Sequence, residues 1–457
     1  MKHKPLGATL AAALLASTAA YAEPTFTPTG YLRLGVGETE GGDFVELQLN
    51  GAWTNYRLGN EADFYGEYGF NLSNKFASGS ELVGGIRYHI SGDSNDLRFS
   101  GEFDADVALR ELWVGYKGLG AGALSESTLW AGRRYYKRKD IHINDFYYED
   151  YSNFNGYAVG LENIQLGFGG LSLAAFTDED NTVTTLDARV EGIELGQNLT
   201  GEVGFAYAIV DDDQPGDDGF ALRGHIQPKE FYGGYLKASL MYSEGAAWGF
   251  FGDGASFASD DRTLTRAQVH GLVPIGDKTE LFFVGLHQVD DDAGSKTRWT
   301  SFGVRPQYTI NNNFALALEV GYDYVDDGAD TRDLTKATIA GIYTFGKSGF
   351  WSRPQLRVFA TTGSWSDFGA ISNQATFGTD TPCTSVGIQF DTSFSADRVA
   401  PCTRSRDAGT AVGIPQVRRS SRQTSSTKKV QANADWKLRT INHHGRASAR
   451  LCKHRAE

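Results

Sequence analysis

The sequence predicts an all-β fold, a transmembrane antiparallel β-barrel, from three observations. The chain opens with an export signal, and no later apolar stretch is long enough to form a spanning helix. The composition is polar on average yet rich in glycine and aromatic residues. Apolar residues also alternate with small or polar ones along many segments. A membrane protein with these properties crosses the bilayer with strands.

Residues 1–22 have the features of a secretory signal peptide. Lys2 and Lys4 form a basic start, residues 6–20 are apolar, and Ala20-Tyr21-Ala22 has the small-x-small pattern of a cleavage site. A signal anchor is the alternative, but the apolar stretch is shorter than the ~20 residues that a spanning helix requires. We therefore expect an exported protein whose mature chain begins at Glu23.

The composition agrees with a barrel. Glycine accounts for 55 of 457 residues and aromatic residues for 12%, whereas there are only 11 prolines. Lipid-facing and water-facing residues alternate in an outer-membrane barrel, so that hydropathy averages out. Secreted β-sandwiches and propellers can share such a composition. The alternation along the chain favours the barrel.

The clearest alternation lies in residues 314–324. One face carries Phe314, Leu316, Leu318, Val320, Tyr322 and Tyr324, and the other carries Ala315, Ala317, Glu319, Gly321 and Asp323. The same period places Leu32, Leu34 and Val36 opposite Tyr31 and Arg33, and places Phe64, Tyr68 and Phe70 opposite Tyr65 and Glu67. If the apolar faces contact lipid, then Tyr31, Arg33, Tyr65 and Glu67 face the lumen of the barrel.

The barrel is expected to occupy residues 23–394. The alternating segment 386–394 ends at Phe394 and resembles the terminal aromatic strand of bacterial outer-membrane proteins. A large porin uses on the order of 20 residues per strand with its connection, which gives sixteen to eighteen strands. Acidic segments at 211–213, 290–292 and 326–328 are interpreted as loops; calcium sites are the alternative there, but none shows ordered ligand spacing.

Residues 395–457 differ from the rest of the chain. They hold 14 Lys and Arg but only 4 Asp and Glu, without periodicity. A nucleic-acid-binding arm is one interpretation of this basic segment, but it does not suit an exported barrel. A disordered extension, translated beyond the natural stop or frameshifted, is favoured, and no nucleic-acid partner is expected.

The cysteines and histidines indicate no metal or cofactor. Cys383 precedes the last strand, and Cys402 and Cys452 lie in the basic segment, so a Cys383–Cys402 bridge is conceivable but no framework spans the barrel. Among the nine histidines, only His443 and His444 are paired in sequence. Neither a P-loop nor a Ser-His-Asp set is present.

Residues 130–160 carry the strongest functional signal, WAGRRYYKRKDIHINDFYYEDYSNFNGYAVG. This run combines arginines, carboxylates and aromatic rings. Guanidinium and carboxylate groups hydrogen-bond the hydroxyls of a sugar, and aromatic faces cover the apolar faces of pyranose rings. The run therefore predicts a sugar-binding segment.

The same run resembles the constriction loop of the maltoporin family. Further blocks occur in the family's order: Asn55–Glu61, Gly160–Ile164 with Gly167-Phe168-Gly169, Gly303–Pro306, and Trp351–Pro354 followed by Arg357–Thr361. The resemblance covers residues 29–394. It implies a homotrimer of 18-stranded barrels in the outer membrane, each narrowed by an inward-folded third loop. It also implies passive diffusion of maltose and maltodextrins along an aromatic slide flanked by ionisable residues.

Carried over position by position, the resemblance implies a set of sugar-binding residues. They are Tyr31, Arg33, Arg57, Tyr65, Glu67, Arg110, Arg138, Asp140, His142, Asp145, Tyr147, Tyr235 and Trp365. For each arginine the alternative is a lumen residue that only balances charge. Alternation supports inward positions for Arg33 and Glu67, whereas Arg110 shares a strand face with Leu112 and Val114. Outer-membrane lipid and a periplasmic sugar-binding protein are the further expected partners.

Two departures from the family pattern point to a shorter slide. The aromatic residue that a neighbouring subunit contributes has only Phe99 as a candidate here, and Ser393 replaces the penultimate tryptophan of the last strand. The bulky Arg138 and Tyr147, together with Asp150, favour maltodextrins over sucrose. A sucrose-type or general diffusion porin is the alternative channel.

An enzyme is the other class considered. Asp140, Asp145, Glu149 and Asp150 could supply the two carboxylates of an exported glycosidase, which lie ~5 to 9.5 Å apart. The loop resemblance already accounts for these acids, and no second catalytic block is present. We therefore expect a channel rather than an enzyme.

Overall fold

The computed structural model describes residues 24–40, 42–93, 105–149, 157–177, 180–252, 254–367, 369–378 and 382–395. The predicted signal peptide, Phe99, Asp150, Cys402 and the basic segment after residue 395 lie outside the described residues. Among the described residues, no helix has the length and apolarity of a membrane span.

The strands are long and follow one another with few helices between them. Their bounds are β1 Thr25–Thr39, β2 Gly42–Asp43, β3 Asp63–Lys75, β4 Glu81–Asp93, β5 Asp106–Lys117, β6 Thr128–Arg133, β7 Lys139–Ile141, β8 Phe146–Glu149, β9 Tyr157–Gln165, β10 Gly170–Thr177, β11 Val183–Glu194, β12 Leu199–Val210, β13 Gly219–Pro228, β14 Tyr235–Glu244, β15 Arg262–Ile275, β16 Thr279–Asp292, β17 Ser295–Thr309, β18 Phe314–Asp326, β19 Thr331–Thr344, β20 Gln355–Trp365 and β21 Cys383–Ser395. The helices are the 3-10 turns η2 Gly122–Leu124, η3 His142–Asn144 and η4 Gly245–Phe250, and the short α2 Gln374–Phe377.

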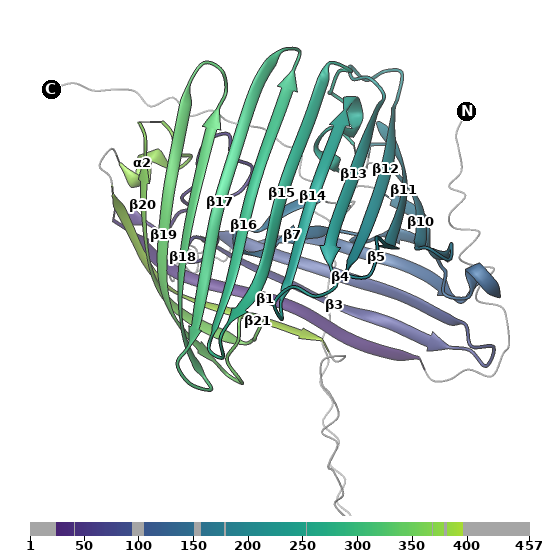
Figure 1. Ribbon diagram of the computed structural model, residues 1–457, viewed down its shortest axis with the longest axis horizontal. Coiled ribbons are helices and arrows are strands. Elements are labelled where there is room, and N and C mark those ends of the chain that lie inside the picture. The colour runs from purple at the N-terminus through teal and green to yellow at the C-terminus, as the bar shows by residue number, and fades with distance from the viewer. Residues whose placement is uncertain are drawn as a thin grey trace, which may run out of the picture. The chain divides into compact units, whose positions relative to one another are not determined.

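Eighteen of these strands form a closed antiparallel barrel, and the two-residue β2 is attached to β1. Figure 1 shows β15 to β19 side by side in one wall. The ring closes because β1 pairs with β3 on one side and with β21 on the other, so that Tyr31 lies opposite both Glu67 and Ser393. The predicted barrel and the predicted terminal strand, which continues to Ser395, are confirmed.

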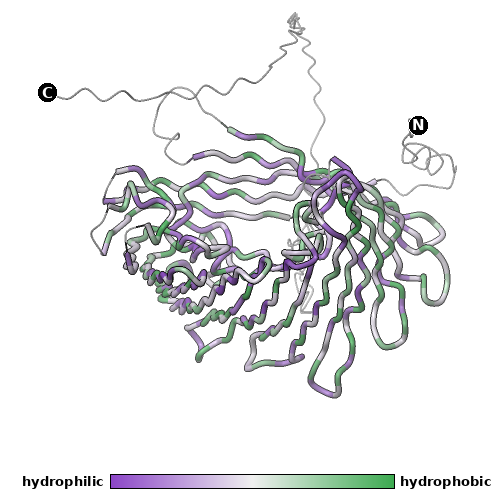
Figure 2. Tube along the Cα trace, turned by 90° about the horizontal axis from the view of Figure 1, so that it is seen from above, coloured by the Kyte–Doolittle hydropathy of each residue, from purple (hydrophilic) through white to green (hydrophobic). Residues whose placement is uncertain are grey.

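The predicted alternation separates an outer apolar face from an inner polar one. On β18, Leu318 is 45% exposed on the outside, whereas Glu319 is fully buried inside. Figure 2 shows this as alternating hydrophobic and hydrophilic stretches along the strands. Outward Tyr68 and Phe70 and inward Arg33 and Glu67 follow the same rule, although Phe64 is buried. An apolar exterior of this kind is what a lipid bilayer requires.

Two of the acidic segments interpreted as loops belong in part to strands. Residues 290–292 end β16, and Asp326 ends β18. Asp290 accepts a hydrogen bond from Trp248 Nε1 at 2.9 Å and pairs with Arg262 at 3.1 Å. Strand pairing extends past the apolar band here, because cross-strand arginines neutralise the acids.

The connections differ at the two ends of the barrel. The end that carries Thr25 and Ser395, called the turn end, has mostly short turns such as 276–278, with 345–354 as a longer one, whereas the opposite loop end carries the longest connections, such as 44–62. Among the described residues, those that pack inside the barrel include 44–62 of the first loop, 134–149 of the third loop, and 245–252 and 254–261 of the sixth loop. Their apolar side chains share one core with inward residues of the wall.

Two glycines fix the position of the first loop. Gly303 on β17 and Gly321 on β18 lie against the ring of Tyr56, and a Cβ atom on either would come within 1.9 Å of it. Tyr56 also hydrogen-bonds Ser301 Oγ at 2.9 Å. Only glycine allows this close approach, so the wall has a notch that receives Tyr56.

Candidate functional site

The third loop forms a hairpin inside the lumen. Its strands β7 and β8 pair only with each other in the described structure, and η3 lies between them. Asp145 turns the chain with φ of 51°, a left-handed conformation that aspartate tolerates better than most residues. The predicted inward-folded constriction loop is thus confirmed.

The hairpin presents five of the predicted site residues to the lumen: Arg138, Asp140, His142, Asp145 and Tyr147. The Arg138 guanidinium lies between two rings, with Cζ 4.0 Å from the centroid of Tyr135 and 4.4 Å from that of Tyr147. Cation–π contacts on both faces fix the plane of the guanidinium group. Arg138 is therefore held in a fixed orientation within the third loop.

One polar cluster joins the first loop, the third loop and β1. Arg33 and Arg57 both donate to Glu61 Oε1, at 2.5 and 2.7 Å. Arg33 also binds Asp63 at 2.6 Å, and Arg57 donates to Asp145 Oδ1 at 3.2 Å and to Tyr31 Oη at 3.3 Å. We call Arg33, Arg57, Glu61, Asp63 and Asp145 the open cluster, because its outer acids are partly exposed to the lumen.

A second polar group lines the wall of β3 to β5. Glu67 Oε1 accepts hydrogen bonds from Tyr65 Oη and Tyr135 Oη, both at 2.6 Å. Arg110 reaches within 3.5 Å of His89 Nε2. A β-bulge at Arg110 places Glu111 opposite Arg87 and Leu109 opposite Tyr88, so that Arg110 is the extra residue. The bulge turns Arg110 inward although strict alternation groups it with the outward Leu112 and Val114.

Aromatic rings follow the same passage. The centroids of Tyr31 and Tyr65 are 6.1 Å apart. Further along, Trp351 lies 4.8 Å from His142 and 6.3 Å from Phe282, and Phe282 lies 6.3 Å from Tyr235. Phe282 is fully buried, so the rings with a face available for stacking are those of Tyr31, Tyr65, Tyr235 and Trp351.

Trp351 is the functional candidate that sequence reasoning missed. Its ring is 46% exposed and touches the constriction, whereas Trp365 is 6% exposed and packs on Phe377 with centroids 6.0 Å apart. In the sequence, Trp351 belongs to the Trp351–Pro354 block. This block supports the family resemblance but does not by itself identify Trp351 as a binding residue. Alternation could not place Trp351, because it lies in the turn 345–354 rather than in a strand.

Two arginines were also missed, Arg353 within this block and Arg357 just after it. Arg353 Nε lies 2.8 Å and Arg357 Nη2 lies 2.5 Å from the same oxygen of Asp391 on β21. Gln389, two residues earlier, donates to Glu61 at 2.8 Å. These contacts extend the open cluster across the seam where the barrel closes.

A third group of charges fixes the end of the third loop to the wall. Glu149 is 1% exposed and lies 3.0 Å from Arg189 Nη2, 3.4 Å from Arg223 Nε and 3.1 Å from His225 Nε2. Both arginines also bind Asp187. We call Glu149, Arg189, Arg223, Asp187 and His225 the sealed cluster. Burial acts to raise the pKa of Glu149, but Arg189, Lys139 and Arg223 hold it well below its usual range.

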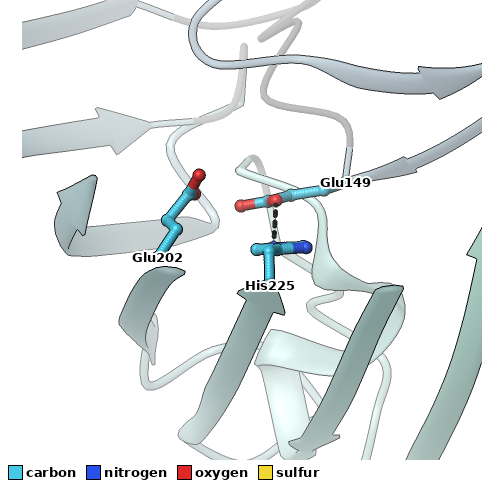
Figure 3. Close-up of side chains that lie close together, drawn as sticks. All are labelled: Glu149, Glu202 and His225. Atoms are coloured by element: carbon cyan, nitrogen blue, oxygen red, sulfur yellow. Dashed lines mark ion pairs between the residues drawn. The ribbon is translucent and has the colours of Figure 1, made fainter. Parts of the chain in front are cut away.

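Glu149, Glu202 and His225 converge closely enough to suggest a metal site (Figure 3), since their ligand atoms lie within 4.8 Å of one another. The charges around them do not fit a metal ion. Glu149 already faces two arginines, and Glu202 lies 2.7 Å from Lys139 Nζ. A divalent cation would have to displace these cations.

Electrostatics within the inward loops set two further protonation states. Burial, with Arg57 and Arg305 nearby, lowers the pKa of His142 well below its ordinary value, so the ring is neutral at neutral pH. Burial and the neighbouring Asp63 raise the pKa of Glu46 in the first loop to about 7. Glu46 lines a hollow of about 330 Å³ with Asp63 and Asp93, at the loop end.

Two of the acids considered for a glycosidase are paired with arginines. Glu149 is sealed among arginines, and Asp145 is held by Arg57. Asp140 lies near enough to Asp145 for their charges to interact, and Asp150 lies outside the described residues. Ion pairs with arginine therefore account for two of the four acids.

Comparisons with solved structures return outer-membrane barrels of low sequence identity. In-vitro folded OmpT, an outer-membrane protein of Vibrio cholerae, is 13% identical, with 82% of this chain and 100% of that chain covered at a TM-score of 0.41. OccAB2 of Acinetobacter baumannii is 10% identical, with 82% and 98% covered at 0.45. The outer-membrane protein opdK of Pseudomonas aeruginosa is 12% identical, with 81% and 99% covered at 0.44.

The family comparison is more specific. The model of the LamB porin family matches residues 26–394, which is nearly the whole described barrel. This match agrees with the closed barrel of eighteen strands and with the constriction loop inside it. The chain belongs to the LamB porin family and is an outer-membrane porin channel.

Proposed function

We propose that this channel conducts maltose and maltodextrins by facilitated diffusion. The observation that carries the proposal is the pairing of stackable rings with polar groups along one passage. Tyr31 and Tyr65 are followed by Trp351 and Tyr235, and the open cluster and Arg138 lie beside them.

The chemistry of a glucose unit matches this arrangement. Its ring has apolar faces that stack on aromatic side chains, while its hydroxyls at the rim donate and accept hydrogen bonds. Arginines and carboxylates held by one another can each release one contact and take up a hydroxyl. Many similar exchanges keep the barriers between successive positions low, so that binding does not prevent release.

The proposed sugar-binding residues are those predicted from the sequence, except that one tryptophan is replaced by another. We keep Tyr31, Arg33, Arg57, Tyr65, Glu67, Arg110, Arg138, Asp140, His142, Asp145, Tyr147 and Tyr235 as candidates. Trp351 takes the place of Trp365, because a ring that is buried and packed against Phe377 has no face available for stacking. Assembly as a homotrimer belongs to the same proposal.

Single-channel conductance in a planar bilayer tests the proposal. Maltose, maltotriose and sucrose are titrated separately against the purified protein. We expect block that strengthens from maltose to maltotriose and is weaker with sucrose. Sucrose block as strong as that of maltose would favour a sucrose-type porin, and a channel that no sugar blocks would favour a general diffusion porin.

A further inference from the structure

We propose a subsite for an anionic sugar on the turn-end side of the constriction, with Lys237 as the residue that binds the anionic group. The proposal rests on the proposed sugar channel and adds a substrate class to it. A cavity of about 180 Å³ lies there between the third loop and the wall of β11 to β14. Its lining includes Lys139, Tyr148, Glu202, His225, Gln227 and Lys237.

The size of the cavity suits one sugar unit. Pockets for drug-sized ligands have volumes of roughly 300 to 1,000 Å³, so this one takes a smaller molecule. Hydrogen-bonding groups of both kinds line it, because lysine donates, glutamate accepts, and histidine and glutamine can do both. Tyr235 lies two residues before Lys237 on β14, and its ring centroid is 6.0 Å from Lys237 Nζ. A sugar stacked on Tyr235 would therefore have an ammonium group beside its rim.

The charges of the lining do not cancel. Lys139 Nζ is shared among Glu202 at 2.7 Å, Glu149 at 3.7 Å and Glu191 at 3.8 Å. Lys237, by contrast, makes no ion pair within the described part of the chain. Since Glu202 is neutralised by Lys139, the lining keeps one positive charge, and that charge belongs to Lys237.

The surrounding acids leave Lys237 available. Asp140 of the third loop interacts more strongly with Arg138 than with Lys237. Glu149 and Asp187 are held within the sealed cluster by Arg189 and Arg223. A phosphate or carboxylate on a sugar would give Lys237 the charged partner that the protein does not supply.

Single-channel block of the full-length protein tests the subsite, with solutes added on the turn-end side. We expect glucose 6-phosphate and glucuronate to block about tenfold more strongly than glucose, as one charge-assisted hydrogen bond allows. The two anions distinguish a phosphate preference from a carboxylate preference. Inorganic phosphate is the control for the charge alone, and its block should be weaker than that of glucose 6-phosphate.

Variants assign the effect to one side chain. Lys237→Met should abolish the preference for the anionic sugars, and Lys237→Arg should retain it. Lys278→Met, which removes an exposed lysine from the turn 276–278, should leave the preference unchanged. Equal block by glucose and both anionic sugars, a preference that survives in Lys237→Met, or phosphate block equal to that of glucose 6-phosphate would overturn the subsite.

Maltotriose separates this inference from the function on which it rests. Maltotriose block that is unchanged in Lys237→Met shows that the variant has folded and that the aromatic passage is intact. If maltotriose does not block the native channel but glucose 6-phosphate blocks it through Lys237, the maltodextrin proposal fails and the subsite remains. If neither solute blocks, both proposals fail.

Discussion

The open and sealed clusters are built alike but differ in their access to water. In each, two arginines share one glutamate: Arg33 and Arg57 share Glu61, and Arg189 and Arg223 share Glu149. The outer acids of the open cluster, Asp63 and Asp145, have side chains 33% and 34% exposed, whereas those of Asp187 and Arg189 in the sealed cluster are fully buried. The same chemistry therefore serves two purposes.

Access to water determines whether the ion pairs of a cluster can be exchanged or instead hold the structure together. Exposed ion pairs contribute about 0 to 1 kcal/mol, so a hydroxyl can replace one partner at small cost. Removing one partner of a buried pair costs about 3 to 5 kcal/mol, because the remaining charge stays desolvated. The open cluster can exchange contacts with a solute, while the sealed cluster holds the constriction loop in place.

The largest expected effect is on the sealed cluster. Glu149→Gln leaves Arg189 and Arg223 with one buried acid, Asp187, and should destabilise the packed third loop by about 3 to 5 kcal/mol. We expect a larger single-channel conductance with more current noise, and faster proteolysis within residues 134–149. Asp326→Asn, at a partly exposed pair with Arg298, is the control. If Glu149→Gln has the conductance and the current noise of the native channel, then Glu149 does not anchor the third loop.

The second-largest effect is expected on sugar block, and it should distinguish Trp351 from Trp365. Trp351→Leu removes an exposed stacking face beside His142 and should weaken maltotriose block about tenfold, as the loss of roughly 1.4 kcal/mol implies. The matched Trp365→Leu should leave block unchanged, because its ring is buried against Phe377. Titration of maltotriose against both channels gives the comparison, and a stronger effect at Trp365 would reverse the assignment.

A smaller effect is expected within the open cluster. Asp145→Asn removes the charge that faces Arg57 across 3.2 Å and should weaken sugar block by about threefold, as the loss of up to ~1 kcal/mol implies. The channel should keep its native melting temperature, since this pair is partly exposed. A marked loss of thermal stability would place Asp145 with the sealed cluster instead.

The smallest effect is a dependence on pH. With a pKa of about 7, Glu46 is neutral below that pH and charged above it, so the loop end gains negative charge as the pH rises from 6 to 8. Cation selectivity, measured by reversal potentials in a salt gradient, should increase over this range. In Glu46→Gln the increase should disappear.

The same group has a defined linkage to stability. The pKa of Glu46 is raised from the ordinary value of 4.5, so the folded protein binds more protons than the unfolded chain between about pH 4.5 and 7. Its contribution to stability therefore falls as the pH rises through that window. We therefore expect the melting temperature of Glu46→Gln to change less over this pH range than that of the native protein.

The fold was predictable because its signals are local. Each strand contrasts a lipid face with a lumen face, and Leu318 and Glu319 show that contrast in adjacent residues. Inward Arg33 and Glu67 followed from the same rule. The rule fails where the backbone departs from regular pleating, and this explains Arg110, which a bulge turns inward.

The missed parts of the site depend on contacts between distant segments. Trp351 reaches the constriction because a turn folds toward residue 142, and neither segment alone indicates this. Glu149 looked like one of several loop acids, since its partners lie 40 and 74 residues further along the chain on β11 and β13. Pairing of this kind leaves no periodic pattern in a sequence.

The position of the sealed cluster has a consequence for the order of assembly. All of its members lie between residues 149 and 225, whereas closure of the ring joins β1 to β21 at opposite ends of the barrel sequence. The loop entropy lost in forming the cluster is smaller than that lost in closing the ring. The third loop can therefore dock against β11 to β13 while the sheet is still open, before a finished wall obstructs its entry.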